Sequence, residues 1–170
     1  TAHFGDGSNF GVSISYLHEK RLTGTAGALS LLPPISSSTL ILNGDICTNV
    51  NFRQMLKFHN EHQADMILGV WQYEYQIEYG VVETEGYKVV RVTEKPSVKH
   101  SVNTGIYVLS PVCFRLFPKQ IGDNQLFHMT DLLQLAITDN LKVISFPIYE
   151  SWMDIGNIQD YQRAQTSDII

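Results

Sequence analysis

Two aspartates stand where a carboxylate could hold a metal ion. Asp45 follows the short apolar run 39–42 through Asn43-Gly44, and Asp154 follows Trp152-Met153 and precedes a glycine. Mg²⁺ prefers oxygen ligands and shares them with phosphates, so the pair would suit a magnesium site if the fold brought both carboxylates together. Each aspartate also has a purely structural interpretation. Asn-Gly-Asp is a routine turn, and Asp154 could cap the next helix.

Other residues could bind a phosphorylated ligand. The turn Gly24-Thr25-Ala26-Gly27 leads into a predicted helix, where backbone N–H groups suit a phosphate, a ribose or a base edge; close packing explains such a turn about equally well. In Glu94-Lys95-Pro96, Lys95 could neutralise a phosphate and Glu94 could accept hydrogen bonds from sugar hydroxyls. Taken alone, this pair is more typical of a solvated loop. Asn103 begins a predicted strand with a side chain able to bind hydroxyls.

Several kinds of catalytic centre find no support. The six histidines show no HxH or HExxH spacing, and the sequence contains neither a GxSxG elbow nor a GxxxxGK[ST] loop. A serine hydrolase and a P-loop enzyme are therefore disfavoured.

Composition narrows the class of protein further. A chain of 170 residues suits one domain, and a net charge of -5 without a basic stripe argues against nucleic-acid binding. Cys47 and Cys113 form no metal or disulfide pattern. The N-terminus does not resemble a signal peptide, and no apolar run could span a membrane. We therefore expect a cytoplasmic protein that makes no contact with membranes, and the sequence leaves homo-oligomerisation open.

The pattern of apolar residues predicts strands and helices that alternate early, with adjacent strands in the middle of the chain. Asn51 or Asn49 is the expected cap of one helix and Thr130 of another, and Glu85-Gly86 is the expected turn of a hairpin. We expect strands over residues 12–16, 39–42, 66–70, 79–83, 87–93, 103–109 and 143–148, and helices ending near 32 and over 52–62, 112–117, 130–139 and 159–165.

This order predicts an α/β domain with an open, mixed and mainly parallel sheet that carries an antiparallel insertion. Ligands of such sheets lie beyond the carboxyl ends of the strands, which is where Asp45 and Asp154 are predicted. No linker divides the chain, so we expect one domain over residues 1–170.

The order of several motifs resembles one known family. They are Tyr16-Leu17-His18-Glu19, Gly24-Thr25-Ala26-Gly27-Ala28-Leu29, Leu42-Asn43-Gly44-Asp45, Tyr79-Gly80-Val81-Val82-Glu83, Glu94-Lys95-Pro96, Asn103-Thr104-Gly105-Ile106-Tyr107 and Trp152-Met153-Asp154-Ile155-Gly156. Together they cover nearly the whole chain and resemble the sugar-phosphate nucleotidyltransferases. The resemblance implies a Rossmann-like three-layer fold and the transfer of a nucleotidyl group from a nucleoside triphosphate to a sugar 1-phosphate.

The resemblance also implies roles for the residues of these motifs. Gly24, Thr25, Ala26 and Gly27, with Asn43 and Gly44, would contact the nucleotide. Asp45 and Asp154 would hold Mg²⁺, and Lys95 would grip the sugar phosphate. Gly80, Glu94 and Asn103 would contact the sugar. Thr104 stands where relatives often carry alanine, so no role is transferred to it.

One family feature finds no match. The N-terminal Gly-rich loop, which contains an Arg and ends in Pro-Lys, does not occur in these residues, and the chain opens without Met. We therefore expect a fragment that lacks the first strand and loop of the domain and is inactive or a poor catalyst alone.

Two alternatives stay open at this point. One is a non-catalytic nucleotide- or sugar-binding module derived from this fold. The other is a glycosyltransferase, which would carry Asp-x-Asp where this chain has Asp45-Ile46-Cys47. Among nucleotidyl transfers, the Gly-Thr-Ala-Gly-Ala-Leu form favours guanylyl transfer to mannose- or heptose-type phosphates, with the other bases left open.

Overall fold

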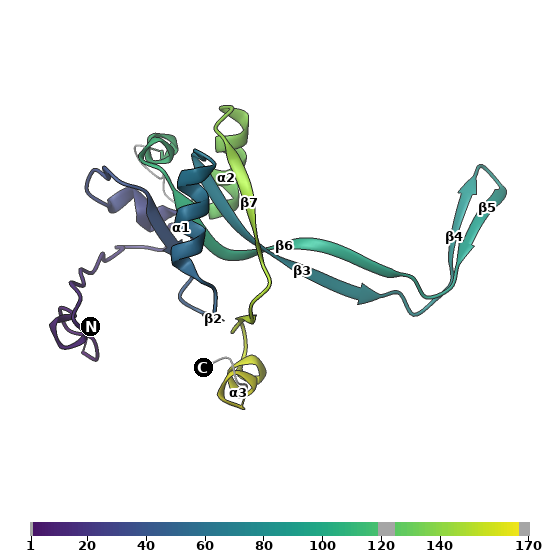
Figure 1. The fold of residues 1–170 in the computed structure, drawn as a ribbon, viewed down its shortest axis with the longest axis horizontal. Helices are drawn as coiled ribbons and strands as arrows, with labels where there is room; N and C mark the ends of the chain where they lie inside the picture. The colour runs from purple at the N-terminus through teal and green to yellow at the C-terminus, as the bar shows by residue number, and fades with distance from the viewer. Residues whose placement is uncertain (1, 119–124, 167–170) are drawn as a thin grey trace. The chain divides into compact units, whose positions relative to one another are not determined.

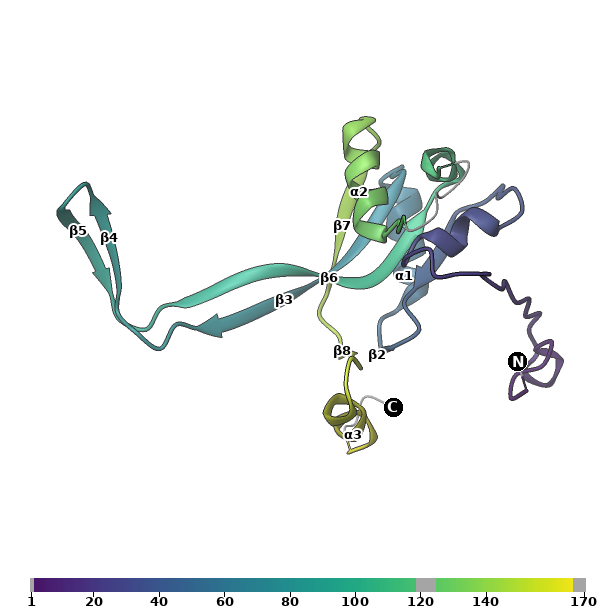
Figure 2. The ribbon, with the colours of Figure 1, turned by 180° about the vertical axis from the view of Figure 1, so that it is seen from behind.

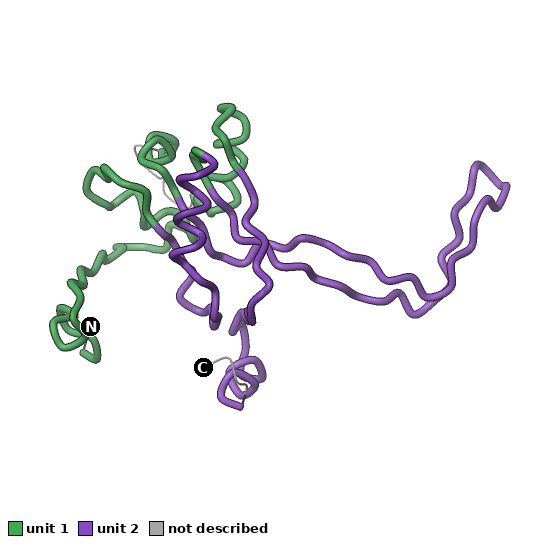
Figure 3. Tube along the Cα trace, viewed as in Figure 1, with its two compact units in different colours: residues 1–39, 63–66, 109–143 green, residues 40–62, 67–108, 144–170 purple. Residues whose placement is uncertain are grey.

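The computed structural model describes residues 2–118 and 125–166 as two compact units (Figure 3). Unit 1 consists of Thr1–Thr39, Gln63–Met66 and Leu109–Val143, and unit 2 consists of Leu40–His62, Ile67–Val108 and Ile144–Ile170. The chain enters each unit more than once, so the units are not successive segments. A single domain over the whole chain stays a prediction.

The main sheet lies largely in unit 2. Its order is β1 (Thr39–Leu42), β6 (Ser97–Leu109), β3 (Met66–Gln76) and β7 (Val143–Ile148). Figure 1 labels β6, β3 and β7. Parallel and antiparallel neighbours both occur, which confirms the predicted α/β class with a mixed sheet. The buried ends of β3 and β6 form much of the core, because Met66, Ile67 and the run 106–109 are almost fully shielded.

Strands β3 and β6 run antiparallel and extend well beyond the strands predicted for them. The hydroxyl of Thr104 donates to the carbonyl of Gly69 at 2.8 Å, and Lys99 forms an ion pair with Glu74. Further along, the N–H of Ile77 donates to the carbonyl of Pro96 at 3.0 Å. Figure 2 shows this pair leading to the hairpin of β4 (Val81–Glu85) and β5 (Lys88–Thr93). The hairpin turns at Gly86, as predicted.

Helix α1 (Phe52–Glu61) forms as the sequence predicts. The Asn51 side chain accepts a hydrogen bond from the N–H of Gln54 and caps the helix. Its apolar face packs against β7, where the ring centroids of Phe58 and Phe146 lie 5.3 Å apart.

Helix α2 (Met129–Thr138) is capped by residues other than the predicted Thr130. His128 is the N-cap, and its N–H donates to the Asp131 carboxylate at 2.7 Å. The hydroxyl of Thr25 accepts from the N–H of Met129 at 3.0 Å. The prediction was wrong because this last contact comes from a residue far away in the sequence. In unit 1, α2 also packs against a short 3-10 helix, Pro111–Leu116.

The predicted strand over residues 12–16 does not form. These residues bond to the loop just before them instead, with the Val12 N–H donating to Gly7 O at 3.2 Å and the Ile14 N–H to Asp6 O at 2.7 Å. Alternating polarity alone does not make a strand, since a strand also needs a neighbour for its backbone groups. Elsewhere in unit 1, the predicted helix ending near 32 is a 3-10 helix, Gly27–Leu31.

A second, two-stranded sheet was not predicted. Strand β2 (Ile46–Thr48) pairs antiparallel with β8 (Trp152–Asp154), and α3 (Ile158–Thr166) follows β8. Among the residues that the structure describes, no helix has the length and apolar character needed to cross a membrane.

Gly69→Ala should lower the free energy of unfolding by about 1–3 kcal/mol, because overpacking a core costs this much. A Cβ at Gly69 would lie 2.7 Å from Thr104 Oγ1 and 2.9 Å from Ile148 Cδ1. Urea denaturation measures the change. Gly156→Ala is the matched control, since its Cβ would meet nothing within 4 Å. Equal stability of the two variants would contradict the packing described.

Native protein treated with iodoacetamide at pH 8 should be labelled at Cys47 and spared at Cys113. Burial, assisted by the negative charge of Asp65, raises the pKa of the Cys113 thiol to about 11, and the thiolate is the reactive form. The stabilising contribution of this protonated thiol is present below its ordinary pKa of 9.0 and is lost as the pH rises toward 11. Labelling in denaturant, located by mass spectrometry, should reach both cysteines; equal native labelling would refute the burial of Cys113.

Candidate functional site

The pairing of β2 with β8 brings the backbones of Asp45 and Asp154 together. Ile46 is the register partner of Asp154, and the N–H of Ile155 donates to the carbonyl of Asp45 at 2.8 Å. The backbone of Asp45 therefore lies close to that of Asp154, just beyond the end of the β2–β8 pairing, although more than a hundred residues separate the two in the sequence.

Both aspartate side chains are exposed. Asp154 lies within β8 and lines a cavity, whereas Asp45 belongs to the turn just before β2. Two accessible carboxylates fit Mg²⁺, which usually takes one or two carboxylates and completes its shell with water and phosphate oxygens. Within residues 2–118 and 125–166, no three His, Cys, Asp or Glu residues cluster as a metal site would require, so a metal here would depend on such external ligands.

The structural interpretation of Asp154 as a helix cap is wrong. Asn157 caps α3 instead, because its Oδ1 accepts hydrogen bonds from the N–H groups of Gln159 at 2.9 Å and Asp160 at 3.0 Å. Asp154 is thus available for another role.

A small cavity of about 140 Å³ adjoins Asp154 within unit 2. Its wall is mostly amide, hydroxyl and aromatic, which suits an uncharged polar ligand group. The residues lining it are Asn43, Ile46, Asn103, Thr104, Gly105, Tyr107, Trp152 and Asp154.

Asn43 packs directly on the backbone of β6. Its N–H donates to the carbonyl of Gly105 at 3.0 Å, and a Cβ at Gly105 would lie 2.7 Å from Asn43 Nδ2 and 2.8 Å from Ile46 Cδ1. Gly105 also has φ +73°, a conformation that favours glycine. Gly105 therefore allows the turn that carries Asp45 to approach β6.

The Asn103 side chain is largely engaged inside the protein. Its Oδ1 accepts from the N–H of Gly105 at 2.9 Å, and its Nδ2 donates to the hydroxyl of Tyr107 at 2.8 Å. Burial raises the pKa of Tyr107, and the hydrogen bond from Asn103 offsets part of that rise. The hydroxyl therefore stays protonated at neutral pH, while Asn103 keeps one N–H and one lone pair for a ligand.

The remaining predicted sugar-site residues lie at the other end of the β3–β6 pair. Gly80 and Glu94 are close, since a Cβ at Gly80 would lie 3.0 Å from Glu94 Oε2. Lys95 is exposed and has φ +42°, and its carbonyl accepts a hydrogen bond from Gln76. Along β6 the stretch from Ser97 to Asn103 spans about 20 Å at 3.3 Å per residue. The structure thus brings Gly80, Glu94 and Lys95 together, and separates them from Asn103.

The turn at Gly24–Gly27 belongs to unit 1, and three of its four backbone N–H groups already donate hydrogen bonds. The N–H of Ala26 donates to Phe127 O at 3.0 Å, that of Gly27 to Gly24 O at 3.1 Å, and that of Thr25 to His128 Nδ1 at 3.4 Å. Gly24 has φ +94°, and a Cβ there would lie 2.5 Å from Phe127 O. The expectation of free N–H groups is therefore wrong for Thr25, Ala26 and Gly27, and close packing explains the glycine at position 24.

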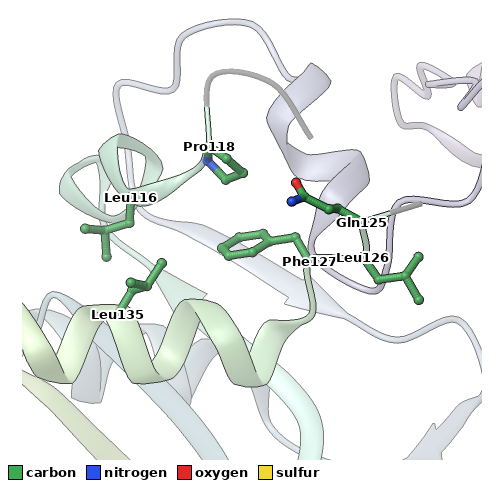
Figure 4. Close-up of a pocket in the computed structure, with 6 residues that line it drawn as sticks. All are labelled: Leu116, Pro118, Gln125, Leu126, Phe127 and Leu135. Carbon is green, nitrogen blue, oxygen red and sulfur yellow. The ribbon is translucent and has the colours of Figure 1, made fainter. Parts of the chain in front are cut away.

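Unit 1 also holds an apolar pocket of about 380 Å³ (Figure 4). The ring of Phe127 points between Pro118 and Leu135, and Leu126 points away from it. Leu116 and Gln125 complete the lining. None of these residues was singled out from the sequence.

Among the cavity residues to which sequence reasoning assigned no role are Tyr107 and Trp152. The sequence did contain a signal for both, because residues at even spacing along a strand share a face. Tyr107 stands four residues after Asn103 on β6. Trp152 stands two residues before Asp154, and its indole N–H donates to the carbonyl of Thr104 at 3.0 Å.

Comparison with known proteins identifies the family. A family model described as Nucleotidyl transferase matches residues 1–169. The chain belongs to this family, as a sugar-phosphate nucleotidyltransferase, which confirms the resemblance seen in its motifs.

The relatives found include mannose-1-phosphate guanyltransferase beta-A of Xenopus laevis, 32% identical over 162 residues, and the mannose-1-phosphate guanylyltransferase catalytic subunit beta of Dictyostelium discoideum, 29% identical over 160 residues. Each alignment covers 89% of this chain and 43% of the relative. The chain therefore spans less than half the length of these curated relatives.

Solved structures confirm the Rossmann-like nucleotidyltransferase fold. A Bacillus anthracis protein assigned as a glucose-1-phosphate thymidylyltransferase aligns with TM-score 0.71 and 21% identity, over 97% of this chain and 69% of that one. HddC from Yersinia pseudotuberculosis aligns with TM-score 0.57 and 20% identity, over 86% of this chain and 63% of that one.

Lys95→Gly should raise the free energy of unfolding by about 0.5–1 kcal/mol, because relief of the left-handed backbone outweighs the extra entropy of glycine in the unfolded chain. Thermal denaturation measures the change. Lys99→Gly is the control, because Lys99 lies in extended β6 and its exposed pairing with Glu74 at 3.3 Å contributes little. A loss of stability in both variants would show that Lys95 is unstrained.

Proposed function

We propose that this chain forms the metal- and sugar-binding part of an enzyme that transfers a nucleotidyl group from a nucleoside triphosphate to a sugar 1-phosphate. The observation that carries the proposal is the meeting of Asp45 and Asp154 on the β2–β8 ribbon, in a chain that belongs to the sugar-phosphate nucleotidyltransferases. In the reaction, an oxygen of the sugar phosphate attacks the α-phosphorus, the bond to the bridging oxygen breaks, and pyrophosphate leaves.

The cavity beside Asp154 suits this reaction because, apart from that aspartate, its polar lining consists of neutral positioning groups. Its lining contains amide, hydroxyl and indole groups but no histidine among the described residues. The attacking phosphate oxygen is already ionised at neutral pH, so catalysis depends on alignment and on neutralising charge. Asn103 and Tyr107 would orient sugar hydroxyls, whereas Lys95 lies too far along the β3–β6 pair to bind the phosphate of the same sugar.

Asp45 and Asp154 would hold Mg²⁺ in this proposal. The exposure of both aspartates and the closeness of their backbones support it, because Mg²⁺ usually takes one or two carboxylates and completes its shell with water and phosphate oxygens. When bound, the cation would neutralise charge on the phosphates. The nucleotide would contact Asn43 and Gly44, which lie in the turn that carries Asp45.

Guanylyl transfer to a mannose-type phosphate is the favoured form of the reaction, because the relatives found include mannose-1-phosphate guanylyltransferases. A cytoplasmic location is part of the proposal and is supported by the two cysteines being free thiols.

Asp45→Asn and Asp154→Asn should each lower metal-dependent pyrophosphate release by the full-length protein at least about a hundredfold, because each removes a charged metal ligand. The assay should screen the nucleoside triphosphates against several sugar 1-phosphates, with the highest rate for GTP and mannose 1-phosphate. Asp139→Asn, at the exposed end of α2, is the matched carboxylate control and should act like the unmodified protein.

Near-normal turnover in either site variant would refute the metal assignment. Calorimetric binding of nucleotide without any pyrophosphate release would instead favour the non-catalytic binding module.

A further inference from the structure

The residue two positions before each aspartate donates a hydrogen bond to β6. The N–H of Asn43, two residues before Asp45, donates to the carbonyl of Gly105 at 3.0 Å. The indole N–H of Trp152, two residues before Asp154, donates to the carbonyl of Thr104 at 3.0 Å. Two consecutive carbonyl groups of β6, those of Thr104 and Gly105, therefore accept these two hydrogen bonds.

The segment of β6 that accepts these two hydrogen bonds is itself fixed. Thr104 is 1% exposed, and its hydroxyl donates to the carbonyl of Gly69 on β3 at 2.8 Å. A Cβ at Gly69 would lie 2.7 Å from Thr104 Oγ1, so β3 and β6 can approach each other this closely because Gly69 has no side chain. The acceptor of the Trp152 hydrogen bond thus belongs to the rigid core of unit 2.

Strand β8 needs such an anchor because its own pairing is short. A two-stranded ribbon is marginally stable in water, and β2–β8 has three paired positions, from Ile46 with Asp154 to Thr48 with Trp152. The Trp152 ring also packs on Trp71, with ring centroids 5.9 Å apart. Ring packing is not directional, whereas the indole hydrogen bond fixes the height of β8 along β6.

We propose that Trp152 is a positioning residue for the metal site, and that its indole N–H sets the place of Asp154 relative to Asp45 by holding β8 on the carbonyl of Thr104. This inference rests on the proposed function, because it concerns the same pair of aspartates. It gives Trp152 a task that its ring alone cannot perform.

The test compares Trp152→Phe with Trp71→Phe. Both keep an aromatic ring in the stacked pair, and only the first removes the hydrogen bond to Thr104. Electron paramagnetic resonance of free Mn²⁺ gives the metal affinity of each folded protein. Trp152→Phe should weaken Mn²⁺ binding about fivefold, the equivalent of one hydrogen bond, while Trp71→Phe binds as the unmodified protein does. A merely structural role of Trp152 would lower the melting temperature without changing this affinity.

The outcomes separate the two proposals. If the unmodified protein binds Mn²⁺ and Asp154→Asn abolishes binding, unchanged affinity in Trp152→Phe overturns the positioning role alone. If the unmodified protein does not bind Mn²⁺, the metal site and the positioning role both fall. Hydrogen exchange of the two indole N–H groups, read by ¹⁵N NMR of the unmodified protein, needs no variant: Trp152 should exchange more slowly than Trp71, and equal rates would also overturn the role.

Discussion

The antiparallel pairing of β2 with β8 is the constraint on which the candidate site depends. It joins two segments that are more than a hundred residues apart and so brings the backbones of Asp45 and Asp154 together. One further hydrogen bond extends the β2–β8 pairing at each end. The Thr48 hydroxyl donates to Ser151 O at 2.8 Å, and the N–H of Ile155 donates to Asp45 O at 2.8 Å. Such a short pairing is weak by itself. In our proposal, the positions of Asp45 and Asp154 therefore depend on the hydrogen bonds that Asn43 and Trp152 make to β6.

The exposure of both carboxylates agrees with the chemistry proposed for them. A buried pair of like charges would be costly to ionise, whereas exposed carboxylates stay hydrated and can exchange water for a cation. Two protein ligands leave most of the magnesium shell to water and phosphate, so metal and nucleotide would bind together. The cavity beside Asp154 adds neutral hydrogen-bonding groups, which orient a sugar without adding charge at the reacting phosphorus.

Local interactions explain which parts of this structure could be predicted from the sequence. Helix α1 and its Asn51 cap depend on neighbouring residues, and so does the apolar run that ends at Asp45. The cap of α2 was missed because Thr25 contributes to it from across the sequence. Strands of three residues, such as β2 and β8, carry no periodicity to read. The distance between Lys95 and Asn103 was equally hidden, because it follows from the unexpected length of β6.

The glycines of the family motifs show why a matched motif does not by itself assign a role. At Gly24 and Gly105 a Cβ would strike a neighbouring backbone or side chain, so packing alone requires glycine there, with or without a ligand. At Gly44 a Cβ would meet nothing within 4 Å, so packing within this chain gives no reason for a glycine. Of these three glycines, Gly44 is the one with open space beside its backbone. Its position beside Asp45 is where the nucleotide phosphates would have to lie if the aspartates hold the metal that they share.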